Sequence, residues 1–68
     1  MLQEKTIQKY ANKLVKLENM LKGTLTVAEH KVIENQITEV MNGFMMLTHY
    51  DIAEAMRLDE AVQKLLTK

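Results

Sequence analysis

Histidine side chains are the first candidates for chemistry in this sequence, because an imidazole binds metals and moves protons near neutral pH. The two histidines, His30 and His49, stand nineteen positions apart and form neither an HExxH motif nor a pair four residues apart. His30 and Glu34 are four residues apart, so one helix face would present them together as two ligands of a weak metal site. We expect instead that His30 ends the apolar face of its helix and that His49 caps or packs. The sequence therefore predicts no metal site.

Covalent and acid–base catalysis have little support. The sequence contains no Cys, no Ser and no glycine-rich phosphate loop, so the commonest nucleophiles and phosphate cradles are missing. The adjacent acids Asp59 and Glu60 would point about 100° apart on a helix. A chain of 68 residues is also too short to enclose a deep pocket alone. We expect a protein that is not an enzyme, with no catalytic residue, no cofactor and no small-molecule substrate.

Four lysines near the N-terminus share one helix face, within about 80° of each other, and they are Lys5, Lys9, Lys13 and Lys16. Such a row offers candidate contacts for the phosphates of a nucleic acid. An ordinary solvated face is favoured, because the row has no Arg to fork onto a phosphate. The whole chain is also neutral, with 9 Lys and Arg against 9 Asp and Glu, whereas nucleic-acid binders carry a basic excess. Nucleic-acid binding is therefore the alternative hypothesis.

Three helices must position these residues, over about 2–22, 26–47 and 51–67 of a single domain that spans 1–68. The sequence has no Pro, only two Gly and no lasting strand-type alternation. In the first helix, apolar residues recur at spacings of three and four, which is typical of a helix packed against one partner. They are Ile7, Tyr10, Leu14, Leu17 and Leu21. Gly23 follows the last of them and marks the end of the helix.

The second helix begins with a capping box, because Thr26 and Glu29 have the spacing that lets each side chain bond to the other's backbone N–H. Its apolar residues are Ile33, Ile37, Val40, Phe44 and Leu47. The pattern runs through Gly43, so we expect a continuous helix, although Asn42-Gly43 is also a plausible stop. Gly43 costs about 1 kcal/mol relative to Ala inside a helix. Close approach of another helix and a kink are two reasons for it.

The third helix begins near Asp51, where Asp51 and Glu54 repeat the capping-box spacing. Its apolar face consists of Ile52, Ala55, Leu58, Val62, Leu65 and Leu66. The connection Thr48-His49-Tyr50 is short, so the third helix either turns sharply or nearly continues the second.

The expected fold class is all-α, an antiparallel helical hairpin plus a shorter third helix, forming a dimeric helical bundle. The short Thr24-Leu25 link predicts the hairpin. Charge agrees, because the first helix has a net charge of +3 and the rest of the chain −3. The predicted core is Ile7, Tyr10, Leu14, Leu17, Leu21, Ile33, Ile37, Val40, Phe44, Leu47, Leu58, Val62 and Leu65.

Self-association is expected because a small chain without disulfides buries little apolar surface alone. The segment from Val40 to Leu47 is apolar nearly all round, and one chain covers only part of it. The predicted interface, for a second copy or another protein, is Val40, Met41, Phe44, Met45, Met46, Ile52 and Met56. A core in which Met fills gaps within a monomer is the alternative.

The function that follows is a non-enzymatic interaction or regulatory protein, homodimeric through its second and third helices, that binds a macromolecular partner. Purely structural self-assembly is a third class. The sequence shows neither a signal peptide nor a membrane-spanning run, so we expect a complete cytoplasmic gene product. In length and helix order the chain resembles two groups of short bacterial, phage or plasmid regulators, the dimeric RNA-binding hairpins and the sporulation aspartyl-phosphate phosphatases. The Ser-x-x-Leu-Asp signature of the latter is absent, so no functional residue is carried over.

Overall fold

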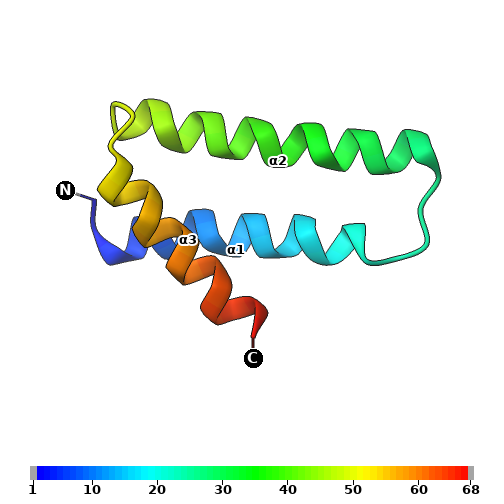
Figure 1. Ribbon diagram of the computed structural model, residues 1–68, viewed down its shortest axis with the longest axis horizontal. Coiled ribbons are helices and arrows are strands. Elements are labelled where there is room, and N and C mark those ends of the chain that lie inside the picture. The colour runs from blue at the N-terminus through cyan, green and yellow to red at the C-terminus, as the bar shows by residue number, and fades with distance from the viewer. Residues whose placement is uncertain (1, 68) are drawn as a thin grey trace.

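Three helices make up the computed structural model, which describes residues 2–67. They are α1 (Glu4–Leu21), α2 (Val27–Leu47) and α3 (Ile52–Leu66), and no strand occurs among the described residues. The chain runs along α1, turns, and returns beside it along α2 before α3 crosses α1 obliquely (Figure 1). The all-helical prediction is confirmed, and each helix begins and ends within two residues of its expected bounds.

The starts of α2 and α3 show how one sequence pattern gives two outcomes. At Thr26 the capping box forms as predicted: Glu29 N–H donates to Thr26 Oγ1 at 3.1 Å, and Thr26 N–H donates to Glu29 Oε1 at 3.0 Å. At Asp51 only half of it forms, because Asp51 Oδ1 accepts from the N–H groups of Ala53 and Glu54. The Glu54 side chain turns away from Asp51 and bonds elsewhere.

α2 is continuous through Gly43 and ends sharply. His49 and Tyr50 adopt left-handed backbone conformations with φ of 56° and 60°, which residues other than glycine seldom adopt. Tyr50 N–H donates to the carbonyl of Met45 at 2.7 Å and closes the helix end. The chain therefore turns sharply into α3 rather than continuing α2.

α1 is the central element, because α2 and α3 both pack mainly on it and touch each other little. The core consists of fully or almost fully buried side chains from all three helices, namely Ile7, Ala11, Leu14, Phe44, Leu58, Ala61 and Val62. Phe44 contributes a ring that meets Tyr10 edge to face, with centroids 5.2 Å apart. In Figure 1 the C-terminal half of α3 runs away from α2, so α2 has one well-packed neighbour.

Two residues of the expected apolar faces lie outside the core. Leu47 is 48% exposed, so its assignment to the packed seam of the single chain is wrong, and Ile52, on the expected apolar face of the third helix, is 74% exposed. Leu47 is the last residue of α2, where the chain turns toward α3. α3 is rotated so that Glu54, Leu58, Ala61 and Val62 face inward, which points Ile52 away from α1. The remaining predicted core residues are buried or half-buried.

Candidate functional site

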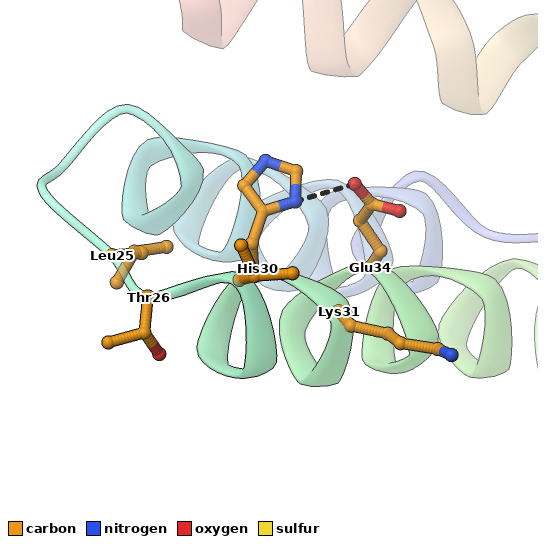
Figure 2. A pocket seen from close by; sticks show the side chains of 6 residues that line it. Leu25, Thr26, His30, Lys31 and Glu34 are labelled. Carbon is orange, nitrogen blue, oxygen red and sulfur yellow. Dashed lines mark ion pairs between the residues drawn. The ribbon is translucent and has the colours of Figure 1, made fainter.

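The two histidines lie apart and differ in surroundings. His30 lies at the edge of a shallow depression of about 420 Å³ near the start of α2, lined by Leu25, Thr26, Val27, His30, Lys31 and Glu34. Figure 2 shows the His30 ring leaning toward Glu34, with 2.6 Å between Nδ1 and Oε1, while Lys31 points away. Within residues 2–67 no group of three or more His, Cys, Asp or Glu converges on a metal position. His49 lies exposed in the turn after α2.

A polar cluster that the sequence did not reveal joins the start of the chain to α3. Glu54 is 5% exposed, and its Oε2 accepts from Leu2 N–H at 3.0 Å. Arg57 Nη1 lies 3.0 Å from both Glu54 oxygens and donates to the Leu2 carbonyl at 2.9 Å, and Nη2 pairs with Glu4 at 3.2 Å. The Leu2 N–H, aided by Arg57, lowers the pKa of Glu54 against the opposing effect of its burial. These contacts point to a structural clasp.

The predicted phosphate contacts Lys5, Lys9, Lys13 and Lys16 are all exposed on α1. None of the four forms an ion pair within the part of the chain that the structure describes. Lys13 Nζ lies 5.8 Å from the centre of the Tyr10 ring, within cation–π range. Lys13 and Lys16 also line a depression between α1 and α2. Lys5 and Lys9 are not among its lining residues.

The structure places the predicted interface residues on different sides of the molecule. Phe44 is completely enclosed in the chain's own core, and Val40, Met41 and Met45 are half-buried against it. Met46, Ile52 and Met56 are 61–74% exposed, and Tyr50, which was not predicted, is 69% exposed beside them in sequence. We call the four exposed residues around the α2–α3 turn the corner patch: Met46, Tyr50, Ile52 and Met56.

A second apolar surface lies along α1 and α2, and no residue of α3 lines it. Two depressions of about 460 and 360 Å³ share Met20 and Gln36 and so adjoin each other. We call them the open groove. Its lining is Lys13, Lys16, Leu17, Met20, Ala28, Glu29, Val32, Ile33, Gln36, Glu39 and Val40. Of these, only Val40 was among the predicted interface residues. Val32 is apolar, lies outside the predicted apolar seam of the second helix and is 54% exposed, so it also marks this surface.

A smaller cleft of about 230 Å³ is lined by residues of all three helices. Met41, Ala55 and Asp59 are among its lining residues. It exists because α3 packs on α1 and diverges from α2 (Figure 1). Met41 therefore faces a different side of α2 from Val32 and Gln36, and one partner surface does not reach all the predicted interface residues.

Comparison with known proteins gives no family assignment: no protein-family model, curated protein or solved structure matches the chain. Among the described residues, no helix has the length and apolar character needed to cross a membrane.

Proposed function

We propose that the chain is a non-enzymatic cytoplasmic interaction protein that self-associates and binds a macromolecular partner, with α2 and α3 contributing the contact surface. In this proposal α1 and α2 form an antiparallel hairpin, and two chains form a homodimeric helical bundle. The observation that carries the proposal is the corner patch, where four large apolar side chains stand 61–74% exposed around a single turn. Large apolar side chains that stay exposed close together in the sequence are candidates for protein–protein contact.

Energetics supports contact at this patch. Full burial of a Met or Ile side chain contributes roughly 1.5–3 kcal/mol. Ile52 and Met56 are four residues apart and so lie on one face of α3, from which both can enter the same partner surface. The His30–Glu34 pair and the Glu54 clasp supply no comparable support for catalysis, because their polar groups bond within the chain.

Sedimentation equilibrium from micromolar to millimolar concentration tests the self-association. We expect the apparent mass to rise with concentration toward that of a dimer. A chain that stays monomeric through the millimolar range refutes the self-associating function. Ile52→Glu and Met56→Glu should weaken the dimer if the corner patch takes part in self-association, and should leave it unchanged if the patch binds only the other partner. Asn35→Glu, which adds the same charge on an exposed position of α2, is the matched control. Circular dichroism must show unchanged helicity in all three variants.

Nucleic-acid binding through the α1 lysines is the second candidate. The absence of ion pairs to these lysines within residues 2–67 favours it, because their charge is free to meet phosphates. Fluorescence anisotropy with a labelled duplex tests it. Binding through Z phosphates should weaken with a log–log salt slope of about −0.9Z. Lys5→Gln with Lys9→Gln should reduce that slope, because two phosphate contacts are lost. These two lysines are chosen because they lie outside the open groove. A complex that is insensitive to salt contradicts this function.

A further inference from the structure

We infer that the open groove seats a second copy of this chain, related by a two-fold axis parallel to α1 and α2, so that α1 of each copy lies over α2 of the other. This inference rests on the proposed self-association and names its surface. It assigns the self-contact to α2 together with α1, on the side of the hairpin that α3 does not cover. Ile52 and Met56 of the corner patch, which lie on α3, are then left for the other macromolecular partner.

The exposed area of the chain matches what such a dimer needs. One chain exposes 5106 Å², whereas a compact monomer of 7.9 kDa exposes roughly 4,400 Å². The excess of about 700 Å² is close to the roughly 800 Å² that each partner contributes to an interface of standard size. A second copy is therefore sufficient to cover the surplus surface.

The floor and edge of the groove suit a helix. Leu17, Met20 and Val40 present apolar surface to it, and Val32 continues this surface toward the start of α2. Gly43 lies three residues after Val40 and seven after Gln36, so it extends the same side of α2. A Cβ built at Gly43 meets no atom of this chain within 4 Å. Packing inside the chain therefore gives no reason for the glycine, whereas close approach of a partner helix does.

The charges at the two edges of the groove are opposite. Lys13 and Lys16 stand on the α1 edge, and Glu29 and Glu39 stand on the α2 edge. Two hairpins that meet face to face can be related by a two-fold axis across the helices or along them. An axis across the helices places α1 over α1, and lysines then face lysines. An axis along the helices places α1 over α2, and lysines then face glutamates, which charge complementarity favours.

The register follows from the same axis. A two-fold axis parallel to the helices leaves every residue at its own level along the bundle. Lys13, Lys16 and Glu39 already border one depression in a single chain, so they are at one level. Lys13 and Lys16 of one copy therefore come level with Glu39 of the other, and Met20 comes level with Val32. Because the dimer has two-fold symmetry, each of these contacts occurs twice.

Charge reversal followed by mixing tests the arrangement. The first variant is Lys13→Glu with Lys16→Glu, and the second is Glu39→Lys. Each places like charges across the interface in its own homodimer, so each should raise the dissociation constant roughly tenfold or more at low salt. An equimolar mixture should restore wild-type affinity, because acids then face lysines at both contacts. Restoration also shows that both variants fold. Asn35→Glu, which lies outside the groove, is the control. Sedimentation equilibrium and native mass spectrometry measure the dimers.

Each alternative result has a distinct meaning. Reversed variants that self-associate as wild type, with or without loss of the dimer in Ile52→Glu, overturn the groove assignment and leave the proposed self-association standing. If wild type binds the Lys13→Glu, Lys16→Glu variant more tightly than it binds itself, α1 lies over α1 and the stated axis is overturned. A wild-type chain that stays monomeric at millimolar concentration removes the inference and the proposed self-association together. The inference is supported when each reversed variant binds itself weakly and the mixture of the two returns to the wild-type affinity without exceeding it.

Discussion

Gly43→Ala should stabilise the single chain. Gly43 has an ordinary helical φ inside α2, and the added methyl group meets open space within this chain. Only the helix preference of the residue then changes, which is worth about 0.5–1 kcal/mol in favour of Ala. A domain of this size shifts its melting temperature by about 4–8 °C for each kcal/mol. Urea and thermal unfolding, followed by circular dichroism at low micromolar concentration, measure the gain.

The same substitution should weaken the dimer if a partner helix approaches closely at Gly43. Asn42→Ala is the matched control, because it also improves helix preference but its Cβ points about 100° away from the Cβ that alanine adds at position 43. Both variants should stabilise the monomer, and only Gly43→Ala should raise the dissociation constant of the dimer. A destabilised Gly43→Ala monomer refutes the description of this side of α2 as open. A dimer of unchanged affinity refutes close approach at this residue.

Three further substitutions test the cap, the core and the clasp. Thr26→Ala removes one acceptor of the α2 capping box and should destabilise the chain by about 1 kcal/mol in urea unfolding. Phe44→Ala opens a fully buried site and should cost about 3–5 kcal/mol, enough to remove most of the helical signal of so small a chain. Glu54→Gln should destabilise the chain at neutral pH. Because the folded pKa of Glu54 is lowered from 4.5, wild type should lose stability as the pH falls below 4.5 through the folded value. The unfolding free energy of Glu54→Gln should lack that part of the acid-induced loss. If the unfolding free energies of wild type and variant fall in parallel as the pH drops, the clasp is contradicted.

Local signals explain which parts of the fold were predictable. The capping box at Thr26 depends on atoms three residues apart, and the spacing in the sequence determines it. Asp51 and Glu54 have the same spacing, but Glu54 bonds to Leu2, which is 52 positions away in the chain. No local sequence pattern predicts a contact between residues so far apart in the chain. The closest signal was the Glu54–Arg57 spacing of three, which predicts an ion pair on a helix but not that it is buried.

Predicting the candidate surfaces required the rotation and crossing of α3, which apolar spacing does not fix. The spacing placed Ile52 on the apolar face of α3 because it is an aliphatic residue in phase with Ala55. The structure rotates the face toward Glu54 and Ala61 instead, since a small Ala allows close packing and Glu54 reaches Leu2. Ile52 is left exposed, and its place in the predicted interface stays a prediction.

The number of helices around α2 connects the fold with the need for a partner. α2 carries apolar side chains on more than one side, with Met41 and Met45 on one side of the seam and Val32 and Leu47 on the other. α1 covers the seam itself, and α3 crosses α1 and leaves α2 (Figure 1). Val32 and Leu47 are therefore about half exposed, at 54% and 48%. A helix with such a surface is stable in water when another helix covers it. A second copy in the open groove supplies that helix, and Ile52 and Met56 of the corner patch stay accessible because no residue of α3 lines the groove.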